Sequence, residues 1–264
     1  MRVDYGISEL APYINWIYFF HAWGTSGVPQ AERRQLQAEA EQRLQRYADR
    51  YRAHALVELF DARGECDDIV VRHEGRDEAI PCLRQQEQGS GYRCLADFVG
   101  PNDRIGVFAT TVDSGMETDF DDDPYEKMMM QLLADRLAEA AAERLHEWVR
   151  KSLWGYAPDE QLTIGEMLSE QWQGIRPAVG YPSLPDASLN FLLDRLLGFS
   201  QIGIRLTESG AMKPHASVSG LMLACPEARY FSVGTIGADQ LADYARRRGV
   251  PVGLMRKFLG GNLQ

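Results

Sequence analysis

The chain has 264 residues, of which 45% are hydrophobic, so it is long enough and apolar enough to form one large globular domain or two small ones. Its 38 acidic side chains outnumber its 28 basic ones, and the formal charge of −10 argues against a surface built for nucleic acid or anionic lipid. Since no apolar run approaches the roughly 20 residues of a membrane span, no signal segment opens the chain and its cysteines form no C-x-x-C pair, we expect a cytoplasmic protein with reduced thiols.

The first predicted element is an aromatic segment at residues 11–23. Its aromatic side chains are Tyr13, Trp16, Tyr18, Phe19, Phe20 and Trp23. Such a segment should dock on the core and fix the N-terminal part of the chain. Asn15 is a short amide within this apolar run, so if it is buried it needs hydrogen-bond partners from the protein or from a ligand.

A helix and several short strands are predicted next. Residues 31–51 form an amphipathic helix, because apolar side chains recur there every three or four positions. Extended runs follow at residues 56–60, 69–71, 94–99 and 105–112. Strands this close together, without helices between them, imply antiparallel pairing.

The longest helical pattern spans residues 125–154. The acidic cluster that ends at Asp123 complements the positive end of this helix dipole, and it lacks the glycine spacing of a calcium loop. One helix face is apolar and the opposite face carries ionisable side chains. These are Asp135, Glu139, Glu143, His146 and Arg150. Such a face is typical of solvent exposure; the alternative is that part of it walls a cleft, with Glu139 aimed at a cationic ligand.

The loop at residues 174–182, Gly-Ile-Arg-Pro-Ala-Val-Gly-Tyr-Pro, organises the chain. Pro177 and Pro182 lack N–H donors and Gly180 permits unusual backbone angles, so neither a helix nor a central strand can pass through. The only charge is Arg176, whose planar fork suits a carboxylate or a phosphate. The loop is therefore interpreted either as a cradle for a small molecule or as a connector whose Arg176 caps a helix end.

Further elements are predicted on both sides of this loop. They are helices at residues 164–172, 188–197, 238–248 and 251–259, and an antiparallel strand pair at residues 221–224 and 229–234. The hydroxyl-rich stretch after residue 206 does not have the G-x-S-x-G spacing of a hydrolase nucleophile. Without repeats or a linker, residues 1–264 are predicted to form a single α+β domain.

Eight ordered blocks of sequence resemble one known family. They are Y-I-N-W at 13–16, L-R-Q-Q at 83–86, C-L-A-D-F at 94–98, A-D-R-L-A-E-A at 134–140, W-G-Y at 154–156, the loop at 174–182, L-T-E-S at 206–209, and Y-F at 230–231 with D-Y-A at 243–245. Together they resemble the C-terminal reactivation domain of cobalamin-dependent methionine synthase, over nearly the whole chain. The resemblance implies a twisted antiparallel sheet flanked by helices and a site for S-adenosylmethionine.

The chemistry that this resemblance implies is reductive methylation. In the family, an electron from flavodoxin or a similar donor and a methyl group from S-adenosylmethionine convert cob(II)alamin back to methylcobalamin. The sequence has no D-x-H-x-x-G cobalamin signature, so we expect the cobalamin on a separate methionine synthase chain and no activity from this protein alone. Two alternatives are a non-catalytic S-adenosylmethionine-binding sensor or scaffold, and a reactivator of a different corrinoid methyltransferase.

The resemblance also implies which residues meet the cofactor. Arg176, Ala178 and Gly180 would cradle it, with Arg176 on the carboxylate and backbone groups on the adenosine. Asn15 would meet the α-ammonium, Glu139 and Glu170 would lie near the sulfonium, Tyr230 and Phe231 would flank the ligand, and Tyr181 would complete the set. Carboxylates and aromatic faces are suitable neighbours for the fixed positive charge of a sulfonium. No catalytic side chain and no metal ligand are expected.

Three departures from the family pattern affect this site. Asn15 stands where the family has Asp, Val179 stands where Pro is usual, and the stretch after Asp186 lacks the usual His-Thr-Glu. Weaker cofactor binding or an altered docking edge would follow from them. In addition, Tyr230 and Phe231 could not both face the ligand from a regular strand, because strand side chains alternate.

Overall fold

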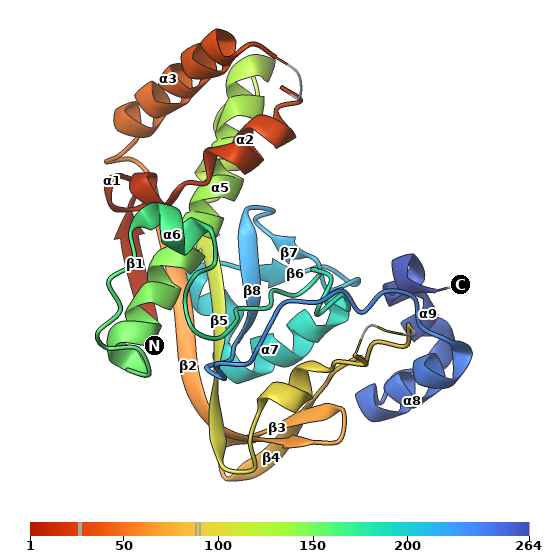
Figure 1. Cartoon of the computed structure of the whole chain (residues 1–264). Coiled ribbons are helices and arrows are strands. Elements are labelled where there is room, and N and C mark those ends of the chain that lie inside the picture. Colours follow the sequence, from red (N-terminus) through yellow and green to blue (C-terminus); the bar gives the residue numbers. More distant parts are fainter. Residues whose placement is uncertain (26–27, 88, 90, 264) are drawn as a thin grey trace.

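The centre of the molecule is an antiparallel sheet of six strands (Figure 1). The computed structural model describes residues 1–25, 28–87, 89 and 91–263. The strands are β1 (Arg2–Gly6), β2 (Arg52–Glu65), β3 (Asp68–His73), β4 (Arg76–Pro81), β5 (Asp103–Val112) and β8 (Ser217–Met222), in the order β4-β3-β2-β5-β8 with β1 paired to β2. β6 (Arg205–Leu206) and β7 (Met212–Lys213) form a separate pair. The predicted antiparallel sheet is confirmed.

Helices flank this sheet, as expected (Figure 1). They are α1 (Ile7–Leu10), α2 (Trp16–Ala22), α3 (Gln30–Arg46), α4 (Gly115–Thr118), α5 (Pro124–Trp148), α6 (Ile164–Leu168), α7 (Asn190–Leu197), α8 (Ala238–Arg248) and α9 (Val252–Phe258). The carboxylate of Asp123 caps α5 by accepting from the N–H groups of Tyr125 and Glu126, at 3.0 and 3.1 Å. Among the described residues, none of these helices is both long and apolar enough to cross a membrane.

The long strand β2 explains how the sheet is assembled. β5 pairs with one edge of β2 from Ala53 to Ala62. The opposite edge is shared, because β1 pairs with its beginning and β3 with its end. Residues ahead of the aromatic segment are therefore part of the same sheet, although the sequence patterns did not predict β1.

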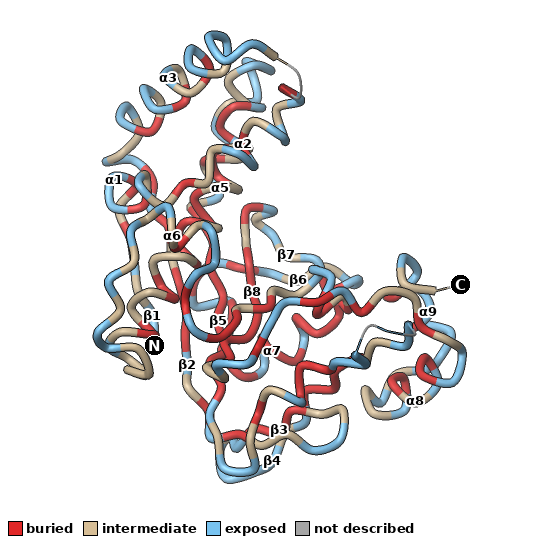
Figure 2. Tube along the Cα trace, in the orientation of Figure 1, coloured by how far each residue is buried: buried red, intermediate tan, exposed pale blue. Residues whose placement is uncertain are grey.

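Two hydrophobic cores lie on the two faces of the sheet, and β5 belongs to both of them. Ile105 and Val107 point into the core beneath α7, whereas Phe108 and Val112 point into the core beneath α5. This follows from the alternation of strand side chains. Burial on both faces also explains why residues 105–109 of β5 carry no polar side chain, and Figure 2 shows the buried trace through the centre of the sheet.

Two strand predictions were wrong. Only Cys94 of residues 94–99 makes a β-bridge, and Leu95–Phe98 is a 3-10 helix capped by Asp97, whose carboxylate accepts from the Cys94 N–H at 2.8 Å. Residues 229–234 form no strand. β8, at residues 217–222, begins four residues before the partner strand predicted at residues 221–224 and overlaps it only at residues 221–222. The N–H of Val233 instead donates to the Pro182 carbonyl at 2.9 Å, so this segment lies along the loop at residues 174–182.

Most predicted helices are present, with different ends. α3 ends at Arg46, five residues early, and the predicted helix at residues 164–172 is only Ile164–Leu168. The long helix continues beyond Trp148 as a π-helical turn, Val149–Leu153. The helix at residues 238–248 is confirmed, and strand β4 was not predicted at all.

Candidate functional site

A cleft of about 740 Å³ lies between α5 and three other segments. These are the aromatic segment with α2, the loop at residues 174–182, and residues 230–232. Its size suits a small molecule or cofactor. The aromatic segment and the loop at residues 174–182 thus line the same cleft.

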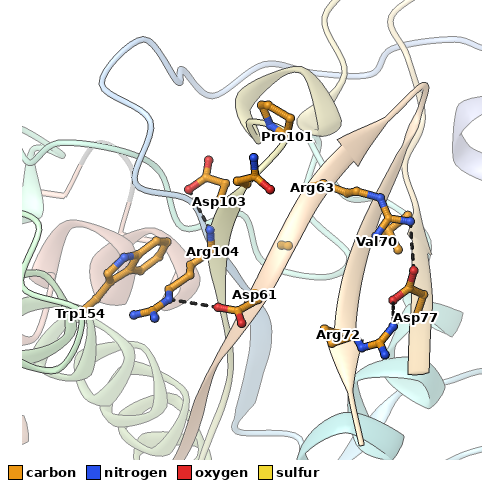
Figure 3. Close-up of a pocket in the computed structure, with 11 residues that line it drawn as sticks. Asp61, Arg63, Val70, Arg72, Asp77, Pro101, Asp103, Arg104 and Trp154 are labelled. Carbon is orange, nitrogen blue, oxygen red and sulfur yellow. Dashed lines mark hydrogen bonds and ion pairs between the residues drawn. The ribbon is translucent and has the colours of Figure 1, made fainter. Parts of the chain in front are cut away.

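A second hollow, of about 810 Å³, lies where β2, β3 and β5 run beside Trp154 (Figure 3). Most of its charged side chains are already paired with one another: Arg63 and Arg72 bind Asp77 at 3.1 and 2.8 Å, and Arg104 binds Asp61 at 3.2 Å. Each of these side chains is at least 41% exposed. Such pairs are typical of solvated surface, and the first cleft is the candidate site.

Backbone hydrogen bonds fix the loop at residues 174–182 on the edge of β8. The N–H of Val179 donates to the Ser219 carbonyl at 2.9 Å, and the N–H of Leu221 donates to the Pro177 carbonyl at 3.0 Å. This close approach requires Gly220, because a Cβ there would lie 2.2 Å from the Pro177 carbonyl oxygen. These hydrogen bonds thus fix the position of the loop relative to the sheet and the cleft.

We expect Gly220→Ala to displace the loop and to weaken ligand binding about tenfold or more, with a lower melting temperature. A Cβ at 2.2 Å from a backbone oxygen cannot be relieved by a side-chain rotation. The matched control is Gly165→Ala on α6, where a Cβ meets nothing within 4 Å and an exposed helix gains up to about 1 kcal/mol from alanine. Thermal unfolding and ligand titration of both variants test this, and equal behaviour would contradict the role of Gly220.

α5 supplies the charged wall of the cleft through Arg136, Glu139 and Glu143. These positions are three and four residues apart, so they share one helix face. The prediction that this face is solvated was therefore wrong, and the alternative of a cleft wall is confirmed. Further along the same face the side chains are not exposed either: His146 and Arg150 are both 0% exposed.

The buried end of this face is held by charge pairing and by an aromatic ring. Arg150 binds Glu160 at 2.6 Å and lies 5.0 Å from the ring centre of Trp172. Burial, together with the positive charges of Arg176 and Arg150, holds the pKa of His146 well below its usual value. His146 is consequently neutral and packs edge-on against Trp172.

Arg176 belongs to this loop, and its side chain is only 9% exposed. Its terminal nitrogens bind both carboxylate oxygens of Glu143, and one of them also donates to the Ala142 carbonyl at 3.0 Å. Burial would lower the pKa of Arg176, but the charge of Glu143 and its hydrogen bond raise it, so the guanidinium stays charged. The fork predicted to meet a ligand thus already holds a carboxylate of α5.

The loop is joined to α5 a second time by Tyr181, whose hydroxyl donates to Glu139 at 2.7 Å. Glu170 also lines the cleft, and its own backbone has a positive φ of 57°. Burial raises the pKa of Glu170, and the nearby charge of Glu143 adds to this while Arg176 opposes it. Two carboxylates with different surroundings therefore face the same cavity.

Asn15 and the 230–231 pair complete the cleft. Asn15 is the N-cap of α2, where its side-chain oxygen accepts from the Ile17 N–H at 3.2 Å. Tyr230 and Phe231 both line the cleft, which is possible because they lie in an irregular segment and not in a strand. The Tyr230 hydroxyl accepts from the Arg176 N–H at 2.9 Å and so fixes the loop from the opposite side.

The structure brings nearly all the predicted site residues together. Those that line the cleft are Asn15, Glu139, Glu170, Arg176, Ala178, Tyr181, Tyr230 and Phe231. Gly180 belongs to the same loop, where its φ of 87° makes the turn, but it is not among the lining residues. Sequence reasoning missed Arg136, Tyr18 and His21, which also line the cleft. The helical spacing of Arg136 from Glu139 was the available signal.

Comparison with known proteins gives two findings. The family model described as "Vitamin B12 dependent methionine synthase, activation domain" matches residues 6–249. The chain is also similar to a solved structure titled "Crystal Structure of the MetH Reactivation Domain bound to AdoHcy", with a TM-score of 0.92 and 39% sequence identity. That match covers 100% of this chain and 90% of the other.

Proposed function

The chain belongs to the family of vitamin B12-dependent methionine synthase activation domains, and on that premise we propose that its cleft binds S-adenosylmethionine in support of the reductive methylation of cob(II)alamin. The observation that carries the proposal is the convergence of carboxylates and aromatic rings on one cleft. The similar reactivation domain was solved with S-adenosylhomocysteine, the product that remains after methyl transfer. Isothermal titration with both compounds tests the proposal, and failure to bind either would overturn it.

The residues of the cleft fit this cofactor chemically. Glu139 and Glu170 offer negative charge to a sulfonium, and Tyr181, Tyr230 and Phe231 offer aromatic faces. Pro177, Ala178 and Val218 provide an apolar wall suited to an adenosine ring. Asn15 keeps a side-chain carbonyl that can accept from an α-ammonium. When bound, S-adenosylmethionine supplies the methyl group, while these side chains hold and orient it.

The methyl acceptor in this proposal is cobalamin on a methionine synthase module outside these 264 residues, and the electron comes from flavodoxin or a similar donor. Two exposed aromatic side chains that line the cleft suit docking, since Tyr18 and Tyr181 are 60% and 51% exposed, and Ile17, next to Tyr18 in the chain, is 75% exposed. We place the protein in the cytoplasm, since its four cysteines are all free, as expected in a reducing compartment.

Glu170→Gln should weaken the binding of S-adenosylmethionine at neutral pH about fivefold, because an exposed carboxylate that lines the cleft near a bound cation contributes about 1 kcal/mol. Burial raises the pKa of Glu170 in the free protein, and a bound sulfonium favours the ionised form. Affinity should therefore rise with pH through the mildly acidic range and level off near neutrality. Titration over this pH range measures the effect.

The neutral thioether of S-adenosylhomocysteine provides the control for this prediction. Its affinity should change much less with pH, because it lacks the positive charge that stabilises the Glu170 carboxylate. The Glu170→Gln variant should show the same shallow pH profile with both compounds. A parent protein whose two profiles run parallel would remove Glu170 from the sulfonium end of the cleft.

A further inference from the structure

Residues 230–232 line the cleft although they belong to no helix or strand. Within them, Phe231 is held by the side chain of Ser183, which follows directly after the loop at residues 174–182. The Ser183 hydroxyl donates to the Phe231 carbonyl at 2.5 Å and accepts from the Phe231 N–H at 3.3 Å. Both residues are buried, at 5% and 8% exposed. One hydroxyl group thus satisfies both backbone polar groups of a residue in the cleft wall.

This double hydrogen bond gives Phe231 what a neighbouring strand would have provided. In an antiparallel sheet, two opposed residues can exchange both of their backbone hydrogen bonds. A serine hydroxyl can replace such a neighbour, because it has one proton to donate and two lone pairs that accept. The next backbone groups are also held without a sheet. The Ser232 carbonyl accepts from the Gln85 side chain at 2.8 Å, and the Val233 N–H donates to the Pro182 carbonyl at 2.9 Å.

A second attachment lies at the other end of the loop. The Tyr230 hydroxyl accepts from the Arg176 N–H near the start of the loop, whereas Ser183 acts just past its end. These contacts join the loop to residues 230–232 at two separated points, so the two walls of the cleft are placed relative to each other. A buried N–H or carbonyl group that loses its partner is costly, which keeps Phe231 on the Ser183 hydroxyl.

We propose that Ser183 is a positioning residue, which sets the place of Tyr230 and Phe231 in the cleft and thereby the affinity for the ligand. The inference rests on the proposed function, which supplies the identity of that ligand. The only proton of the hydroxyl is already donated to Phe231, so Ser183 acts through that residue and not as a donor to the ligand. A wall that is held in place before binding needs little ordering when a ligand enters.

Two substitutions of Ser183 test this role. Ser183→Ala should bind S-adenosylhomocysteine roughly tenfold more weakly in isothermal titration, because part of the binding free energy must then order the wall. Ser183→Cys nearly keeps the volume of the side chain but offers only a weak donor and a weak acceptor, so its affinity should fall to a similar extent. In the ligand-free protein, the amides of residues 231–233 should exchange about tenfold faster in both variants than in the parent.

The matched control is Ser188→Ala. Ser188 is another buried serine of the same segment, and its hydroxyl donates to Asp186 at 2.6 Å and accepts from Arg248 at 3.0 Å. It is not among the residues that line the cleft. Its replacement should lower the melting temperature but keep the affinity for S-adenosylhomocysteine within about twofold of the parent. Titrations are run well below the lowest melting temperature, so the split between stability and affinity separates positioning from general stabilisation.

The other outcomes overturn the inference in distinguishable ways. Parent-like affinity in Ser183→Ala would show that the hydroxyl does not set the cleft, and a loss that Ser183→Cys restores would assign the effect to volume. An equal loss in Ser188→Ala would assign it to the stability of the whole segment. In these three cases the parent still binds S-adenosylhomocysteine, and the proposed function stands. A parent that binds neither S-adenosylhomocysteine nor S-adenosylmethionine would overturn the proposed function together with the inference.

Discussion

Replacing Arg176 by alanine is expected to abolish measurable binding of S-adenosylmethionine and to lower the melting temperature of the protein. The substitution leaves Glu143, whose side chain is 15% exposed, without its partner. Breaking a buried pair in this way costs about 3–5 kcal/mol. It also frees a carboxylate in the cleft wall and removes one of the two side-chain contacts that join the loop to α5, so affinity should fall about hundredfold or more. Thermal unfolding and isothermal titration measure the two effects.

Two further variants separate stability from binding. Arg176→Lys should restore little, because a point charge cannot bind both oxygens of Glu143 and the Ala142 carbonyl at once. The double variant Arg176→Ala with Glu143→Ala removes both charges, so part of the stability should return while binding stays lost. Parent-like affinity in Arg176→Ala would show that this residue is not needed for the cofactor site.

The second large effect is expected in a reconstitution with a methionine synthase fragment that lacks its own activation domain. Loaded with cob(II)alamin and supplied with S-adenosylmethionine and a reducing system, the fragment should regain the methylcobalamin spectrum only when this protein is added. The reason is geometric, since on the proposed function the cleft would hold the methyl donor in a fixed place beside the exposed side chains of Tyr18 and Tyr181. Absorption spectra recorded over time measure the recovery.

Controls make this reconstitution decisive. Arg176→Ala should give no recovery, and Arg144→Gln, altered away from the cleft, should recover like the parent. Recovery that is equally fast without the protein would argue against a role in reactivation. No recovery with a cognate partner and donor, despite tight cofactor binding, would favour a sensor or scaffold.

The cradle loop was predictable from sequence because its constraints are local. Two prolines and Gly180 exclude regular structure wherever they stand, and the φ of 87° at Gly180 agrees with this reasoning. The long helix was equally clear from its apolar period. The contact between loop and helix was not predictable, because the ion pair of Arg176 with Glu143 joins residues 33 positions apart.

The errors have a common physical cause, which is that tertiary contacts overrode local patterns. His146 and Arg150 were predicted to lie on a solvated face. Their burial depends on contacts with Trp172 and Glu160, which belong to a later segment of the chain. The apolar stretch at residues 229–234 suggested a strand, but its backbone bonds to the loop instead of a sheet neighbour. Arg136 was overlooked because an unpaired cation cannot be recognised before its neighbours are known.

The position of β5 in both cores has a consequence for the cooperativity of unfolding. Its side chains alternate between the layer beneath α5 and the layer beneath α7, so neither layer can open without exposing apolar surface of the other. Opening either layer alone therefore exposes apolar surface in both layers, which raises its free energy. The two layers should unfold as a single unit, with the slowest amide exchange along β5. Both walls of the cleft are attached to this strand, α5 by packing and the loop through β8. The binding cavity is accordingly preorganised, and little conformational entropy remains to be lost when a ligand enters.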